Sequence, residues 1–113
     1  MEKTLEIDGK QVRFKSTAAT PLRYKAQFGR DFFADLLKME KLRKFDPKKE
    51  NYEVLESLDT TVFLNIVWVL AKTADPKIPD PLTWFDTFES FPLDEVFSHL
   101  QDLLIHSLQS KKK

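Results

Sequence analysis

One stretch of ten residues, from Val62 to Ala71, most constrains the fold of this chain, because only Asn65 interrupts its apolar side chains. The surrounding pattern predicts a long helix from about Glu53 to Ala74 that is apolar nearly all round after Val62. Such a helix must be enclosed by other elements or leave apolar surface exposed. Since a membrane-spanning helix needs about 20 apolar residues, the stretch indicates a core helix and no membrane span.

A β-hairpin is predicted at the N-terminal end of the chain. Residues 3–15 alternate in polarity on both sides of Asp8-Gly9. This dipeptide favours a two-residue type I′ turn, because both turn positions need a positive φ. In that register Leu5 faces Val12, and the residues that share the apolar face are Leu5, Ile7, Val12 and Phe14. Two strands alone are marginally stable, so this face must rest on helices.

Two helices are predicted between the hairpin and the central helix. The first begins with Thr20 as its N-cap and Pro21 as its first helical residue. Gly29 suits the left-handed position after its end. Asp31 is expected to cap the second helix, whose apolar residues recur with helical spacing to about Arg43.

The chain is expected to leave the central helix at Asp75-Pro76, with a short helix over residues 82–88 and an amphipathic helix over 93–108. The apolar stripe of the last helix comprises Leu93, Val96, Leu100, Leu103 and Leu104. The predicted fold is mainly α, of the α+β class, with the hairpin packed on a bundle of about five helices. Residues 1–113 are expected to form a single domain with a hairpin (3–15), a helical part (20–109) and a basic tail (110–113).

The sequence carries no recognisable reaction centre. The absence of cysteine excludes disulfides and thiolate chemistry, and the two glycines cannot form a glycine-rich phosphate loop. The last helix places four potential metal ligands along one side, but such residues are ordinary on a solvated face opposite a leucine stripe. These residues are Glu95, His99, Asp102 and His106. We therefore expect no catalytic residue, no cofactor and no bound metal.

Charge is divided unevenly along a chain whose net charge is zero. Residues 1–50 carry 13 Lys and Arg against 8 Asp and Glu, residues 51–110 carry 2 against 10, and three lysines end the chain. The division predicts self-association in which the basic part of one copy meets the acidic part of another. The alternative is nucleic-acid binding through the basic segment 38–49. Because Glu40 and Asp46 interrupt that segment and Phe45 is its single aromatic residue, we expect no nucleic-acid partner.

The segment after the central helix combines three prolines with a cluster of aromatic residues. The prolines are expected to fix the exit from the helix, so that Trp84 and Phe85 return onto it or beside it. Burial in the core and docking of a partner are both compatible with this cluster. The residues predicted to bind a partner protein are Trp68, Asp75, Pro79, Trp84, Phe85, Phe88 and Phe91.

Three pieces of the chain, in this order, resemble tail assembly chaperones of long-tailed siphophages and prophages of Gram-positive bacteria. They are LEIDGKQVRFK, YKAQFGRDFFADLL and WVLAKTADPKIPDPLTWF, and together they cover most of the chain. The most specific feature is a tryptophan, the motif AKTAD, and a second tryptophan after the prolines. None of these motifs is a catalytic signature.

This resemblance implies a non-enzymatic protein that coats the tape measure protein and is replaced by the major tail protein as the tail tube polymerises. It also implies a place in the cytoplasm of the bacterial host and absence from the mature virion, which agrees with an N-terminus that lacks an apolar export signal. Members of the family commonly have a longer product made by ribosomal frameshifting. Lys111, Lys112 and Lys113 fit an adenine-rich slippery run, although a solubilising tail is equally compatible with them.

Overall fold

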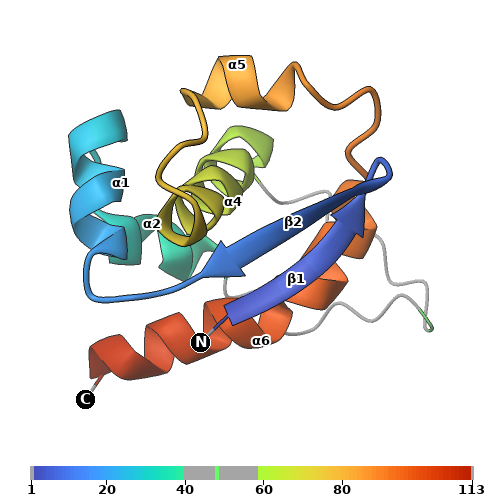
Figure 1. The fold of residues 1–113 in the computed structure, drawn as a ribbon. Coiled ribbons are helices and arrows are strands. Elements are labelled where there is room, and N and C mark those ends of the chain that lie inside the picture. Colours follow the sequence, from blue (N-terminus) through green and yellow to red (C-terminus); the bar gives the residue numbers. More distant parts are fainter. Residues whose placement is uncertain (1, 40–47, 49–58, 113) are drawn as a thin grey trace.

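The computed structural model describes residues 2–39, 48 and 59–112, the last eight of these by their backbone only. Within these residues the chain forms an antiparallel hairpin and five helices, which confirms the predicted α+β fold (Figure 1). The elements are β1 (Glu2–Ile7), β2 (Lys10–Lys15), α1 (Thr20–Phe28), α2 (Phe32–Lys38), α4 (Thr60–Ala74), α5 (Pro81–Phe85) and α6 (Leu93–Lys112). None of the described helices has both the length and the apolar character needed to cross a bilayer.

The hairpin has the predicted turn and register. Asp8 and Gly9 have φ angles of 54° and 74°, as a type I′ turn requires, and Leu5 pairs with Val12. Ile7 and Phe14 are buried on the face that meets the helices. In Figure 1 the hairpin crosses the helices, with β2 packed on α4 and β1 beside α6. The helices therefore provide the support that a two-stranded sheet needs.

The turn between α1 and α2 follows two of the sequence predictions. Gly29 adopts the left-handed conformation, with φ 69°, and its N–H donates to the carbonyl of Lys25. The Asp31 side chain accepts a hydrogen bond from the N–H of Ala34 at 2.8 Å and so caps α2. However, α2 ends at Lys38 rather than near Arg43, and residues 40–47 lie outside the described part of the chain.

The predicted N-cap of α1 is wrong by one position. Ala19 is the cap residue and offers no side-chain hydrogen bond, whereas Thr20 is the first helical residue and is buried. The hydroxyl of Thr73 donates to the carbonyl of Val69 at 2.7 Å, so in its 3.2 Å contact with Thr73 the Thr20 hydroxyl is the donor. Thr20 therefore joins α1 to α4. Its hydroxyl contacts Thr73 instead of capping the helix, which is the role that its local sequence suggests.

A buried carboxylate joins α1 to α2. Asp35, with 1% of its surface exposed, accepts two hydrogen bonds from Arg30, at 2.7 and 2.6 Å, and one from the Tyr24 hydroxyl at 2.8 Å. The Arg30 hydrogen bonds are the main reason that the pKa of Asp35 falls to about 2. Burial, with the Asp35 carboxylate beside it, raises the pKa of Tyr24 above its usual range. The sequence prediction did not include this group.

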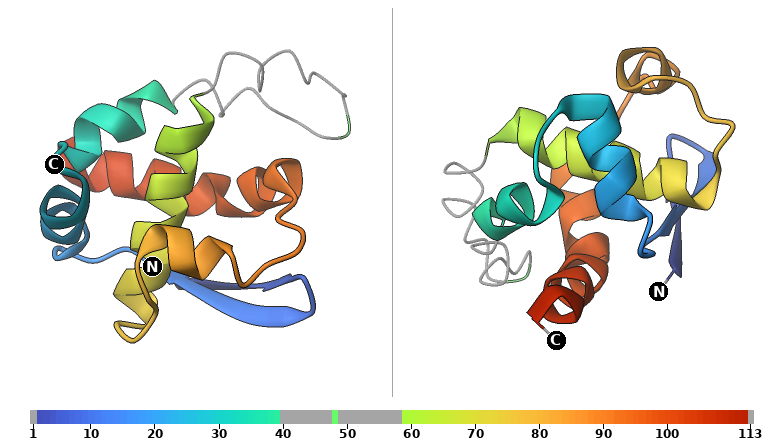
Figure 2. Two further views of the ribbon diagram at one scale, coloured as in Figure 1. Left: turned by 90° about the horizontal axis from the view of Figure 1, so that it is seen from above. Right: turned by 90° about the vertical axis from the view of Figure 1, so that its left-hand side faces the viewer.

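Helix α4 is the centre of the core, as its apolar pattern predicted. It begins at Thr60 rather than near Glu53, because Asp59 is extended and its side chain accepts a hydrogen bond from the N–H of Val62. Residues 49–58 lie outside the described part. Its buried residues cover nearly the whole circumference; they are Val62, Phe63, Ile66, Val67, Trp68, Val69, Leu70, Ala71 and Thr73. Figure 2 shows α4 crossing α6 with α1 and α2 to one side.

Helix α6 extends from Leu93 to Lys112 and so includes residues 110–112, which were assigned to the tail. Four residues of the predicted stripe are buried, and the fifth, Leu93, is half-buried. The prediction missed Phe97, which is buried and packs on Phe63 of α4 with 3.5 Å between ring centroids. This ring pair joins α6 to α4.

Candidate partner-binding surface

The proline segment after α4 is held against that helix by two side-chain donors. The indole N–H of Trp68 donates to the carbonyl of Pro79 at 2.9 Å, and Lys72 Nζ donates to the carbonyl of Ile78 at 2.6 Å. Asp75 is the C-cap of α4. Because prolines restrict the backbone between these contacts, the segment is directed back beside α4.

Helix α5 is a single short turn positioned by its own cap. Asp80 accepts hydrogen bonds from the N–H of Thr83 at 3.1 Å and from the Thr83 hydroxyl at 2.7 Å. These hydrogen bonds hold the pKa of the Asp80 carboxyl below its usual range. Pro81 occupies the first helical turn, where a missing N–H is tolerated. The Asp80 cap therefore fixes the start of the helix that carries Trp84 and Phe85.

The four aromatic residues after the prolines form one cluster. The centroid of the Trp84 ring lies 4.9 Å from Phe85, 5.1 Å from Phe88 and 6.4 Å from Phe91. Trp84 is only 7% exposed, whereas the three phenylalanines are half-buried. The cluster thus combines a buried tryptophan with a partly accessible rim.

The hairpin contacts the chain both after α5, at residues 87–89, and at the end of α4. Lys10 Nζ donates to the carbonyl of Thr87 and lies 4.8 Å from the centroid of the Phe88 ring. At the turn, the Asp8 side chain accepts a hydrogen bond from the N–H of Glu89 at 3.0 Å. Arg13 Nη2 donates to the carbonyl of Ala74 at 2.8 Å. The sequence prediction identified none of these cross-chain contacts.

Two of the most exposed large apolar residues occupy equivalent positions in the sequence. Leu82 follows Asp80-Pro81 at the start of α5 and is 75% exposed, and Leu22 follows Thr20-Pro21 at the start of α1 and is 73% exposed. Leu82 lies beside the aromatic cluster in sequence, and the prediction omitted it. We call Leu82, Phe85, Phe88 and Phe91 the aromatic rim. It is an accessible apolar part of residues 76–92, which we call the proline–aromatic segment.

The seven predicted contact residues occupy different environments. Trp84, Phe85, Phe88 and Phe91 are brought together, and Trp68 is joined to Pro79 by its hydrogen bond. Asp75 and Trp84 help to line a small pocket of about 210 Å³ between β2 and α5. Trp68 is buried and packs edge-on to Phe28, so it offers a partner little surface. Through its hydrogen bond to Pro79, Trp68 instead helps to position the residues that follow α4.

Two other groups of residues were noted in the sequence, and the described part of the chain shows no assembled site for either. Glu95, His99 and Asp102 are exposed, and the side chain of His106 is outside the described part. Among the described residues, no group of three or more His, Cys, Asp or Glu side chains is arranged to hold a metal ion. Of the basic segment 38–49, only residues 38, 39 and 48 are described.

Comparison of this chain with known protein families, proteins and structures identifies no relative. No family model, no curated protein and no solved structure matches the chain. A proposal of function therefore rests on its residues and on the geometry described above.

Proposed function

We propose that this chain is a non-enzymatic tail assembly chaperone of a siphophage or prophage. In this role it binds the tape measure protein, keeps it soluble in the host cytoplasm and helps to recruit the major tail protein before leaving the finished particle. The observation that favours this proposal most is the aromatic rim, because half-buried rings beside an exposed leucine can act as anchors in a protein interface.

The position of the rim fits a chaperone that must later be displaced. A long, partly apolar tape measure protein would aggregate before its tube exists, and many weakly bound copies can cover it. Each rim is small, so each copy adds a modest and reversible contribution. The uneven charge along the chain favours association between neighbouring copies on the same target. That association should weaken with added salt, which sedimentation at low and high ionic strength would measure.

Leu82 and Leu22 provide a matched pair of variants for testing the proposal. The tape measure protein is co-expressed with tagged chain, and the soluble complex is quantified for Leu82→Ser and Leu22→Ser. Each replacement removes a leucine of nearly equal exposure, 75% and 73%, that follows a proline at the start of a helix. If Leu82 becomes buried on binding, its loss should weaken capture about tenfold, whereas Leu22→Ser should leave capture unchanged.

Three results would count against the proposal. Equal loss of capture in both variants would indicate a general apolar effect, and no loss in Leu82→Ser would exclude the rim as the contact. Failure of the unaltered chain to keep any tape measure protein soluble would refute the function itself. A stable DNA complex at physiological salt would instead favour the nucleic-acid alternative. A major tail gene upstream and a tape measure gene downstream would support the chaperone role.

A further inference from the structure

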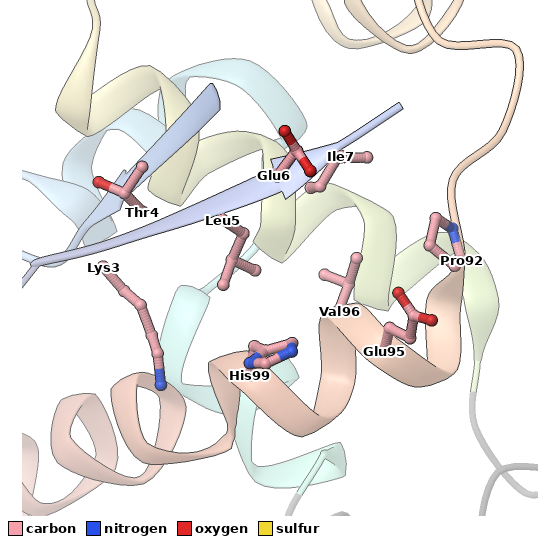
Figure 3. Close-up of a pocket in the computed structure, with 9 residues that line it drawn as sticks. All are labelled: Lys3, Thr4, Leu5, Glu6, Ile7, Pro92, Glu95, Val96 and His99. Atoms are coloured by element: carbon pink, nitrogen blue, oxygen red, sulfur yellow. The ribbon is translucent and has the colours of Figure 1, made fainter. Parts of the chain in front are cut away.

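A second surface lies between β1 and α6, away from α5. It is a groove of about 360 Å³, within the size range of ligand pockets. Figure 3 shows Lys3 and Leu5 pointing from β1 toward α6, with Val96 and His99 on the helix facing them. The floor is therefore partly apolar, and one wall is the main chain of a strand.

The main chain of β1 is open on the side next to this groove. In an antiparallel ladder, hydrogen-bonded pairs alternate with non-bonded pairs, and a two-residue turn makes Ile7 and Lys10 a bonded pair. The N–H and C=O groups of Thr4 and Glu6 consequently point away from β2. Within the described part of the chain, no residue donates to these groups or accepts from them. An unpaired strand edge is a template for another strand.

The other edge of the sheet differs. Residues of β2 line the small pocket beside α5, and Lys10 and Arg13 are engaged with the carbonyls of Thr87 and Ala74. Side chains of β2 are thus tied to the chain on both sides of α5, whereas the described neighbour of β1 is α6, which lies across the groove. Of the two edges, β1 is the one available for pairing.

Charge defines what this edge would accept. Glu6 faces the uncharged Gln11 across the hairpin, and Glu95 contributes a second carboxylate to the groove. Both are exposed, and neither forms an ion pair with a described residue. Lys3 lies at the opposite end of the groove from Pro92 (Figure 3). In the same view Glu6 points away from α6, on the outer face of β1, whereas Glu95 is on the groove side, so the β1 edge offers a basic side chain a carboxylate on either face.

We propose that the β1 edge binds an extended segment of a partner protein, which adds to the sheet as a third strand. Alternate side chains of that segment point to opposite faces, so small apolar residues would enter the groove on the α6 side while basic residues on the outer face meet Glu6. Main-chain hydrogen bonds to Thr4 and Glu6 would supply affinity, and the carboxylates would supply selectivity. This site is separate from the aromatic rim, and it does not depend on the proposed chaperone function.

A second copy of the chain is a poor occupant of this edge. Antiparallel pairing of β1 with another β1 through their open sides, centred on Thr4, would set Glu2 directly opposite Glu6 of the other copy, twice. Like charges in directly opposed positions destabilise a sheet. The acidic residues that oppose this pairing favour a basic strand.

Amide hydrogen exchange of the full chain, followed by NMR, tests the proposal with a capped peptide of alternating lysine and valine. The peptide matches the six residues of β1 in length. We expect exchange at Thr4 and Glu6 to slow about tenfold or more, because these N–H groups gain partners. Exchange at Leu5 and Ile7, which already pair with β2, should change little. A glutamate–valine peptide should give no protection.

Two further controls separate strand addition from simple charge attraction. N-methylation of alternate peptide residues removes the donors on one edge, so one of the two methylated isomers must lose binding. Glu6→Lys should weaken binding of the lysine–valine peptide about tenfold, while Asp86→Lys, the same reversal at the C-cap of α5, should not.

Several outcomes would overturn the proposal. These are no binding of the lysine–valine peptide, binding without protection of Thr4 and Glu6, or equal protection by the acidic peptide. Protection that rises with protein concentration in the absence of peptide would assign the edge to another copy of the chain. None of these results bears on capture through the aromatic rim, so the two proposals fail separately.

Discussion

Helix α4 and the segment that follows it are both rich in apolar side chains, yet the structure holds them by different means. Helix α4 is buried on nearly every side and is stabilised by its neighbours. Residues 76–92 bury Trp84 but are also held by side-chain donors from Lys10, Trp68 and Lys72 to main-chain carbonyls, and Leu82 in this segment is exposed. Polar contacts can fix a segment without enclosing it. Apolar surface therefore remains available to a partner.

The largest effect is expected in α4. Phe63→Ala removes a fully buried ring that packs on Phe97, and should lower the free energy of unfolding by about 3–5 kcal/mol. Leu64→Ala, at a half-buried position on the same helix, should cost less. Urea unfolding of both variants measures the difference. Equal and small losses would contradict the description of α4 as the centre of the core.

A buried polar contact should behave differently from the exposed and half-buried ones that hold residues 76–92. The pKa of Asp35 is about 2 in the folded chain against an ordinary value of 3.8, a difference worth about 2 kcal/mol. Because the folded pKa is the lower one, this contribution is complete above pH 3.8 and is lost as the pH falls toward 2. The difference in stability between the unaltered chain and Asp35→Asn should therefore shrink over this range. A constant difference would mean that the carboxylate charge contributes nothing.

The smallest effect is expected for an exposed contact of the aromatic segment. Lys10→Met keeps most of the aliphatic side chain but removes the donor to Thr87 and the charge over Phe88, and should cost less than about 1 kcal/mol of global stability. Its effect should be local: amides of residues 85–91 should exchange faster, while those of α4 keep their protection. Equal acceleration in both regions would show that the segment and the core open together.

Local signals in the sequence account for much of the fold. Asp8-Gly9 determines both the turn and the register, since only one pairing follows from a two-residue loop. Gly29 and Asp31 mark the end of one helix and the start of the next, because each acts within a few residues of its own position. Asp59 is a similar signal, but it was hidden within a pattern that appears helical on both sides.

The remaining features depend on residues far apart in the chain. Thr20 reads locally as a cap, but Thr73, 53 positions away, makes it a link between helices. The joint contacts of Lys10 with Thr87 and of Asp8 with Glu89 have no signal in either segment alone. For the same reason, sequence could place Trp84 and Phe85 in one cluster but could not assign the first to the interior and the second to the rim.

The central claim is that residues 80–92 form the docking surface while α4 supports them from within. Hydrogen exchange of the chain alone and in complex with the tape measure protein tests this most directly. We predict slower exchange across residues 80–92 on binding, with no new protection specific to α4. Protection confined to α1 and α2, with residues 80–92 unchanged, would contradict the claim.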